Sequence, residues 1–116
     1  VLSFQDFKNP KLNLDKWHKK TGKPVLLADG SGIIKGDGIY KRSDGNWYKD
    51  QIEELFKNPG CIGFHLCGAY QRNKSRARGL LDEFENPDTE NIRIIQKTNE
   101  KLDMLTSKIL YYKKDR

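Results

Sequence analysis

The sequence predicts an α/β unit in which three parallel strands alternate with three helices. Two short runs free of Lys, Arg, Asp and Glu follow residues 23 and 60, and the second, residues 61–67, ends at Gly68. Such runs are typical of strands that are buried on both faces. Stretches with helical periodicity separate and follow them, and right-handed crossovers would make the strands parallel.

The first strand and helix are predicted from residues 1–22. Val1 to Phe4 is a short apolar strand, and Pro10 excludes a continuing central strand. Asn13 is the expected N-cap of a short helix over residues 14–21, and Gly22 the left-handed residue that ends it.

The second strand, Pro24 to Ala28, leads to Asp29 at its exit. Residues 30–46 then contain five glycines and predict a loop, longer than the roughly 2–6 residues usual for such connections and therefore of functional interest. Asn46 is the expected cap of the next helix, which Asn58-Pro59 ends. Four residues make its apolar face: Tyr48, Ile52, Leu55 and Phe56.

A cationic loop follows the third strand. Four basic residues alternate without an acidic one, so an extended loop would place them on one side, suited to sulfate or carboxylate groups. The basic residues are Arg72, Lys74, Arg76 and Arg78.

Asn86-Pro87 predicts the cap and first turn of a long final helix. Its apolar stripe consists of Ile92, Ile95, Leu102, Leu105, Ile109 and Tyr112.

Length and charge limit the function. The 116 residues, 35% apolar and 33% charged, predict a single unit spanning residues 1–116, and the net charge of +6 favours an anionic partner. No stretch approaches the ~20 apolar residues of a membrane span, so we expect no membrane partner. The start at Val1 without Met favours a segment of a larger protein, and the localisation is not written in the sequence.

Neither a metal nor a cofactor is expected, because His18 and His65 are isolated and no CxxC is present. Cys61 and Cys67 are six positions apart in a single predicted strand, or roughly 20 Å. A disulfide needs Cα atoms about 4.4–6.8 Å apart, so free thiols are expected.

A (β/α)8 barrel accommodates this order of elements. Three parallel strands leave sheet edges uncovered, and such sheets are normally buried on both faces. The chain fits the C-terminal βαβαβα portion of a TIM barrel, with strands six, seven and eight and a long closing helix.

Two segments carry a family resemblance. KWHKKTGKPVLLADGS, residues 16–31, and FKNPGCIGFHLCGAY, residues 56–70, resemble the C-terminal end of clan-A glycoside hydrolase barrels, especially agarase-like members. The resemblance covers essentially the whole chain but only the end of the barrel. It implies hydrolysis or binding of an anionic or algal-type polysaccharide, with the remainder of the barrel as a partner.

The resemblance also implies a catalytic residue. Strand seven of the family typically ends in a glutamate nucleophile, and the matching position here is Asp29, one methylene shorter. Retaining hydrolysis needs two carboxyl groups about 5–5.5 Å apart, and the family's acid/base residue belongs to strand four, which this chain lacks. We therefore expect no activity from the fragment alone. An Asp before Gly is also a common turn residue.

The remaining expected contacts lie on the loops and strand exits. Where many relatives carry a tryptophan platform, this chain has Leu66 and Cys67, so Tyr70 is the expected stacking surface. Trp17, in mid-helix, is expected in the core. Substrate-binding residues are predicted to be Gln5, Trp47, His65, Tyr70, Arg72, Lys74, Arg76 and Arg78; His65 and Trp47 are equally compatible with packing roles, and the four cations with a solvated surface.

Two alternatives remain open. The missing glutamate is compatible with a barrel that binds carbohydrate without cleaving it. The charge and the RNKSRAR run are compatible with a small basic nucleic-acid-binding domain. This second alternative is weaker, because aromatic residues interleaved as in RNA-binding sheets, a recognition helix and a zinc finger are all missing.

Overall fold

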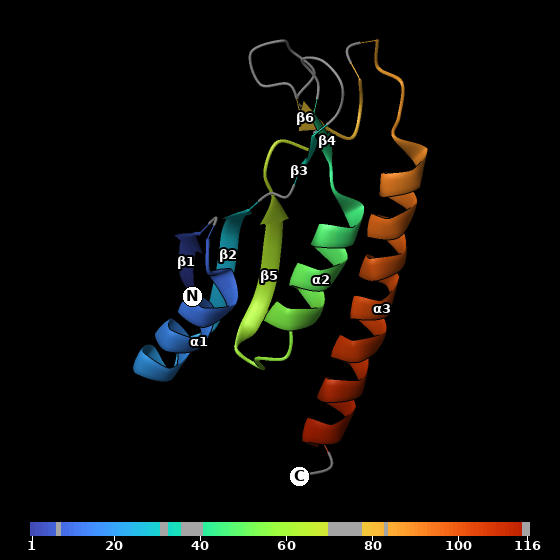
Figure 1. Ribbon diagram of the computed structural model, residues 1–116. Coiled ribbons are helices and arrows are strands. Elements are labelled where there is room, and N and C mark those ends of the chain that lie inside the picture. The colour runs from blue at the N-terminus through green and yellow to red at the C-terminus, as the bar shows by residue number, and fades with distance from the viewer. Residues whose placement is uncertain (7, 31–32, 36–40, 70–77, 83, 115–116) are drawn as a thin grey trace.

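The computed structural model describes the backbone of residues 1–6, 8–30, 33–35, 41–69, 78–82 and 84–114, and side chains up to residue 102 except those of residues 33–35, 41, 42 and 78. Strands and helices alternate along most of this part of the chain (Figure 1). The elements are β1 (Leu2–Gln5), α1 (Pro10–Thr21), β2 (Val25–Gly30), β3 (Ile33–Lys35), β4 (Lys41–Ser43), α2 (Gly45–Leu55), β5 (Cys61–Leu66), β6 (Arg78–Gly79) and α3 (Thr89–Lys114).

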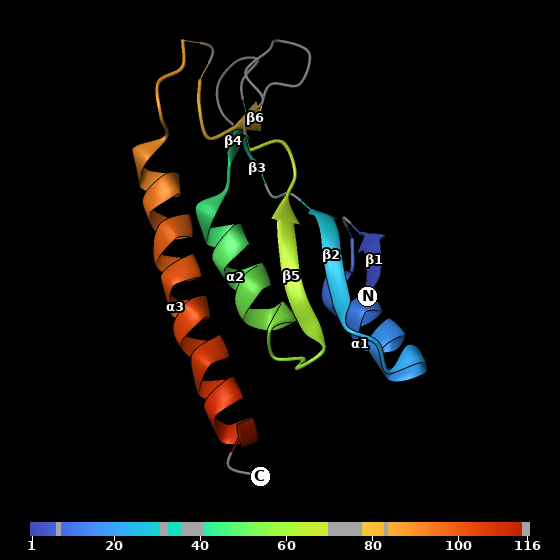
Figure 2. The same cartoon turned by 180° about the vertical axis from the view of Figure 1, so that it is seen from behind.

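The main sheet has the order β1-β2-β5, and both pairs of neighbours are parallel. This confirms the predicted α/β unit of three parallel strands, each followed by a helix. Helices α1 and α2 lie on one face of the sheet and contact each other. The view from behind shows no helix over the opposite face in the described part of the chain (Figure 2). We call that opposite side the open face.

A small apolar core lies between the sheet and the two helices. Side chains alternate along a strand, which turns Leu2 and Phe4 of β1 and Val25 and Leu27 of β2 toward the helices. In β5 a register shift after Cys61 interrupts the alternation, so Cys61 and Phe64 lie on the same side. Burying a large aliphatic side chain contributes about 1.5–3 kcal/mol, which makes this layer the main stabilising contact of the unit. Its buried members are Leu14, Val25, Leu27, Leu55 and Cys61, with Leu2, Phe4, Phe56 and Phe64 packed around them.

A second, smaller sheet lies beyond the carboxyl end of the first (Figure 1). β3 and β4 pair antiparallel, and β4 pairs parallel with β6. The prediction of a wholly irregular loop over residues 30–46 was therefore wrong. The sequence of β4 has no apolar alternation, and its strand conformation depends on pairing with β3 and with β6, the second of which is remote in the sequence.

Helix α1 begins earlier than predicted. It starts at Pro10, whose fixed φ suits the first helical position, and Asn9 occupies the N-cap position in place of Asn13. Asn13 instead donates a hydrogen bond to Asp6. The predicted end is confirmed, because Gly22 has a left-handed φ of 66° and donates to the His18 carbonyl over 2.8 Å.

Helix α2 also begins earlier than predicted, because Asp44 rather than Asn46 is its N-cap. The Asp44 carboxylate accepts hydrogen bonds from the backbone N–H groups of Asn46 and Trp47, at 3.0 and 3.1 Å. The predicted apolar face is confirmed, since Tyr48, Ile52 and Leu55 are buried.

Helix α3 begins at Thr89, so the prediction that Asn86-Pro87 opens it was wrong. Asn86 donates to Asp82 and Pro87 bridges to Leu81, which folds this segment back on itself before the helix begins.

Polar contacts connect α3 to α2. The Gly45 N–H donates to Asn91 Oδ1 over 2.9 Å, and the Tyr48 hydroxyl donates to Asn99 Oδ1 over 2.7 Å. Burial raises the pKa of the Tyr48 hydroxyl. Asn91 and Thr98 are buried, so the part of the α3 contact surface that the structure describes is more polar than the predicted stripe.

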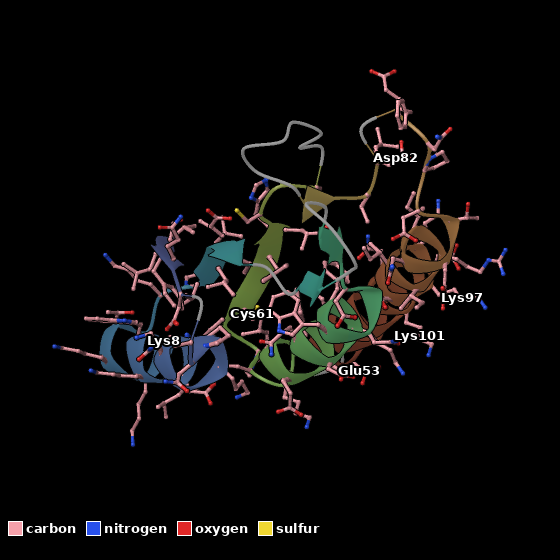
Figure 3. The ribbon with its side chains drawn as sticks, turned by 45° about the horizontal axis from the view of Figure 1, so that its top comes forward. Lys8, Glu53, Cys61, Asp82, Lys97 and Lys101 are labelled. Carbon is pink, nitrogen blue, oxygen red and sulfur yellow. The ribbon has the colours of Figure 1, made fainter. Side chains whose placement is uncertain are left out.

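Two predictions about single side chains have opposite outcomes. No disulfide joins Cys61 and Cys67, as expected, and the Cys61 side chain lies between β5 and the helices (Figure 3), where burial raises its pKa. Trp17 was expected in the core, and that prediction was wrong. It is 38% exposed, with the ammonium groups of Lys16 and Lys20 at 5.6 and 5.4 Å from its ring centre, because Leu14 fills the sheet side of α1.

No helix in the described ranges is long and apolar enough to cross a membrane.

Candidate functional site

A β-bulge at the end of β2 decides where Asp29 lies. Phe4 pairs with Leu27, and both pack on the helix side of the sheet. The next pair along the two strands is Gln5 with Asp29, so Ala28 is an extra residue in β2. Strict alternation would direct Asp29 to the helix side, but the bulge places it beside Gln5 on the open face.

Gln5 and Asp29 form a hydrogen-bonded pair at the carboxyl end of the sheet. Gln5 Nε2 donates to Asp29 Oδ2 over 2.6 Å. A carboxylate only accepts hydrogen bonds, so the Gln5 amide must present its NH₂ group to Asp29 and its carbonyl oxygen Oε1 away from it. Gln5 is an exposed residue, which leaves Oε1 on the accessible side of the pair.

The second oxygen of Asp29 has a different environment. Asp29 Oδ1 is shielded from solvent and has no hydrogen-bond partner. An unpaired buried acceptor costs about 1–3 kcal/mol, and in native proteins such groups are rare and call for an explanation. The carboxylate of Asp29 is therefore short of hydrogen-bond donors.

His65 extends this pair to the third strand. It follows Phe64, which packs on the helix side, so His65 lies on the open face, and it is exposed. The register shift between Leu27 and Gly30 leaves His65 opposite the bulge. Gln5, Asp29 and His65, one from each parallel strand, thus form what we call the carboxyl row. The structure brings these three predicted residues together.

Asp6 is next to Gln5 but has a structural role. Its Oδ1 accepts from the N–H groups of Lys8 and Asn9, at 2.8 and 3.0 Å, and its Oδ2 accepts from Asn13. These bonds, that of Asn13 foremost, lower the pKa of Asp6. Both oxygens accept hydrogen bonds that hold the turn before α1, so Asp6 has a structural role that Asp29 lacks.

Trp47 lies beside the carboxyl row but on the helix side. Its ring centre is 6.0 Å from that of Phe64, and a Cβ added to Gly30 would approach Phe64 to 2.9 Å and Trp47 to 3.7 Å. Gly30 therefore lets the two rings close over the end of β2. In this structure Trp47 supports the backbone next to Asp29.

Most of the predicted cationic loop lies outside the described residues, namely Tyr70, Arg72, Lys74 and Arg76. The backbone of Arg78 is described, and it pairs with Lys41 in the small sheet beyond the carboxyl row. Lys41 in turn pairs with Lys35 on its other side, so three basic residues occupy adjacent register positions there.

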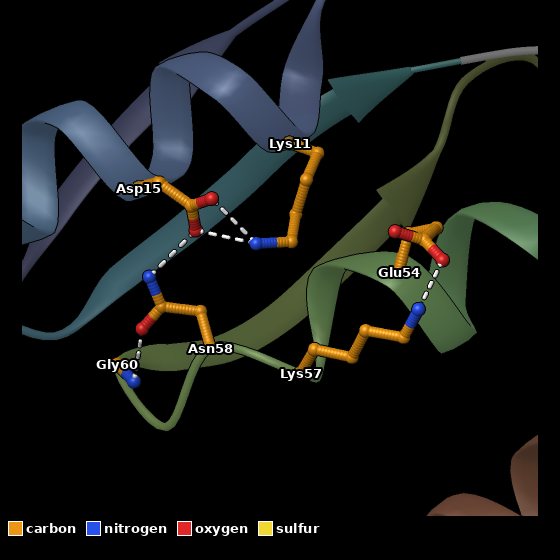
Figure 4. A network of polar contacts seen from close by, with 6 residues as sticks. All are labelled: Lys11, Asp15, Glu54, Lys57, Asn58 and Gly60. Carbon is orange, nitrogen blue, oxygen red and sulfur yellow. Dashed lines mark hydrogen bonds and ion pairs between the residues drawn. The ribbon is translucent and has the colours of Figure 1, made fainter.

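The amino ends of β2 and β5 carry a polar network of another kind (Figure 4). Lys11 Nζ binds both oxygens of Asp15, at 2.7 and 2.5 Å, and Asn58 Nδ2 donates to Asp15 Oδ1 over 2.8 Å. The Gly60 N–H donates to Asn58 Oδ1, also over 2.8 Å. We call these four residues the amino-end network.

His18 completes the packing at this end. Its Nδ1 lies 2.9 Å from the Lys23 carbonyl oxygen, and its ring covers Gly60 so closely that a Cβ there would lie 2.2 Å from Nδ1. His18 is therefore a packing residue.

Within the described residues, no group of three or more His, Cys, Asp or Glu side chains could hold a metal ion. The carboxyl row offers hydrogen-bonding groups: a carboxylate, an amide oxygen and an imidazole. Such groups recognise a ligand rich in hydroxyl groups.

Comparison with protein-family models, curated proteins and solved structures finds no match to this chain. The resemblance to agarase-like hydrolases therefore stays a prediction.

Two parts of the site were beyond the sequence prediction. The bulge at Ala28 was not predicted, although Asp29 and Gly30 follow it directly, and Phe64 was not recognised as the partner of Trp47. The alternation of Phe64, His65 and Leu66 was the available signal for the aromatic contact.

Proposed function

We propose that this chain is the C-terminal part of a glycoside-hydrolase-like TIM barrel that binds a polysaccharide at the carboxyl row and hydrolyses it when the barrel is complete. The strand order β1-β2-β5, with neighbours in chain order and helices on one face, is the order of three successive barrel strands. The open face would then be the barrel interior.

The observation that carries the proposal is the bulge that turns Asp29 toward Gln5. In parallel α/β folds, ligands bind at the carboxyl ends of the strands, and bulges occur next to active sites where they re-aim a side chain. Among the described residues, Asp29 accepts one side-chain hydrogen bond, from Gln5, and its Oδ1 is unpaired, whereas Asp6 nearby accepts three hydrogen bonds that hold the turn before α1. Asp29 is thus the carboxylate equipped to act on a ligand.

In the hydrolytic reaction Asp29 would attack the anomeric carbon or stabilise the positive charge that develops there. A second carboxyl group must protonate the leaving oxygen. Asp6 is engaged elsewhere, so the rest of the barrel supplies the proton donor. The described unit then binds and orients the sugar.

A binding protein without hydrolytic activity is the second candidate. The specific observation in its favour is that the carboxylate at the nucleophile position is an aspartate whose accessible oxygen is already bonded to Gln5. A shorter side chain held in this way reaches less far toward a sugar ring.

The test uses the native polypeptide that contains this chain. It is incubated with neutral and sulfated galactans, and released reducing ends and calorimetric binding are both measured. For a hydrolase, we expect Asp29→Asn to lower the rate at least about 10³-fold while binding persists. Asp50→Asn, on the exposed side of α2, makes the same chemical change as a control and should leave the rate unchanged.

The outcomes separate the candidates. Turnover that survives Asp29→Asn would show that Asp29 is not the nucleophile. Binding without turnover in the unmodified protein would select the binding protein. The proposal fails if no polysaccharide binds, and steeply salt-dependent DNA binding would then favour the nucleic-acid alternative.

A further inference from the structure

We infer that Gln5 and Asp29 together form an acceptor pair that recognises two adjacent hydroxyl groups of a sugar ring. This inference rests on the proposed function and adds to it the chemical group that the carboxyl row selects. It also assigns to Gln5 a role in specificity.

The geometry of the pair leaves acceptors pointing outward. Gln5 Nε2 is used by Asp29 Oδ2 over 2.6 Å, so the outward atom of the amide is its oxygen. Asp29 Oδ2 has a second lone pair, because a carboxylate oxygen accepts about two hydrogen bonds. Two acceptor oxygens are thereby fixed next to each other on adjacent strands.

The spacing of the pair follows from the sheet. β1 and β2 are neighbouring parallel strands, about 4.7–4.9 Å apart, and the Gln5–Asp29 hydrogen bond draws the two side chains closer than the backbones. Two hydroxyl groups on neighbouring ring carbons can reach such a pair together. An isolated hydroxyl would satisfy only one of the two oxygens.

The negative charge of Asp29 and its lack of hydrogen-bond donors decide which groups of a ligand can bind. Because Oδ1 is shielded from solvent, a ligand reaches this carboxylate through Oδ2, which accepts only hydrogen-bond donors. Hydroxyl groups supply donors, whereas a sulfate or carboxylate group supplies only acceptors and is repelled by the negative charge. Anionic substituents of a polysaccharide must therefore lie away from this pair.

Calorimetric binding to the native polypeptide tests the inference with three probes: a neutral β-1,4-linked galactan hexasaccharide, whose rings carry free hydroxyl groups on neighbouring carbons, the same sugar with its hydroxyl groups O-methylated, and a sulfated carrageenan hexasaccharide. We expect O-methylation to weaken binding more than about tenfold, because a site built for hydroxyl donors rejects an analogue that lacks them. Gln5→Met, similar in size but without an acceptor or donor, should weaken binding of the neutral sugar about tenfold.

Ser3→Ala is the matched control, since Ser3 is exposed on the same strand and the same face as Gln5 and should leave binding unchanged. The inference is overturned if the neutral sugar binds Gln5→Met as tightly as the unmodified protein, or if the O-methylated sugar binds as tightly as the free one. In both cases polysaccharide binding, and so the proposed function, still stands. If none of the three sugars binds, the proposed function fails and the inference fails with it.

Discussion

The two ends of the main sheet differ in how completely their polar groups are paired. At the amino end, Asn58 connects the Asp15 carboxylate to the Gly60 N–H, and Lys11 binds the same carboxylate (Figure 4). At the carboxyl end, Gln5 is the side-chain partner of Asp29 among the described residues, and the second oxygen of Asp29 is buried without one.

This difference indicates that the two ends of the sheet have different roles. The amino-end network rigidifies the end where the strands begin, while Gln5 Oε1 and Asp29 Oδ2 at the other end are the acceptors proposed to bind a ligand. In (β/α)8 barrels the same division separates a stabilising face from a catalytic face. Substitutions at the amino end should therefore cost stability, and substitutions in the carboxyl row should cost binding.

The largest effect is expected from Gly60→Ala. The new Cβ would lie 2.2 Å from His18 Nδ1, so the ring must leave its place beside the Lys23 carbonyl. We expect a loss of about 1–3 kcal/mol in the free energy of unfolding, measured by chemical denaturation. Adding His18→Ala removes the obstacle and should recover part of that loss. If the double variant is as unstable as the sum of both changes, the ring contact is not the cause.

Asn58→Ala should have the next largest effect. It removes the donor to Asp15 and leaves the Gly60 N–H without its side-chain acceptor, at an expected cost of about 1–2 kcal/mol. Thermal unfolding followed by circular dichroism would detect it. Asn46→Ala, on the exposed side of α2, is the control. Equal melting temperatures for the two variants would contradict a stabilising amino-end network.

Asp29→Asn should change stability in the opposite direction or not at all. It removes a charge whose buried oxygen is unpaired, so the free energy of unfolding should stay constant or rise by up to about 1 kcal/mol. Gln51→Leu is the matched control, because Gln51 Oε1 is also buried without a partner but lies between α1 and α2. Both variants should keep their stability, and only Asp29→Asn should lower the rate of sugar hydrolysis. A loss of more than about 1 kcal/mol for Asp29→Asn would make this carboxylate structural.

The smallest effect is the contribution of Asp15 to acid stability. Burial disfavours its charge, but the hydrogen bonds from Lys11 and Asn58 outweigh this and lower the pKa of Asp15 below its ordinary value of 3.8. A carboxyl group with a lowered pKa in the folded state stabilises the fold above its unfolded pKa, and this contribution is lost as the pH falls through the folded pKa. Stability should therefore decline below about pH 4.

Asp15→Asn should flatten that decline by less than about 1 kcal/mol, because the Asp15 side chain is 44% exposed and solvent screens the pair. Urea midpoints at pH 3 and pH 6 give the comparison. An unchanged difference between the two midpoints in the variant would assign the acid sensitivity to other carboxylates, such as Asp6.

The spacing of apolar residues and the residues that end helices predicted much of the fold. Apolar runs predicted β2 and β5, the spacing of Tyr48, Ile52 and Leu55 predicted the buried face of α2, and Gly22 marked the end of α1. These features are local, because a strand or a helix face is read from neighbours within a few residues. The parallel order of the strands followed from the general handedness of crossovers.

Helix starts were predicted less well. Several Asn and Asp residues near each start could serve as the cap, and the residues that do so are Asn9 and Asp44. The small sheet was missed because β4 and β6 pair across a long stretch of chain, and short polar strands carry no period of their own.

The sequence by itself determined that Gln5, Asp29 and His65 lie at the exits of three parallel strands, because the carboxyl ends of such strands share one end of the sheet. Only the tertiary structure decided that they form one row on one face. The bulge at Ala28 shifts the register by a residue, and with a period of two such a shift exchanges the faces of a strand. The same register pairs Asp29 with Gln5 and leaves one carboxylate oxygen without a partner.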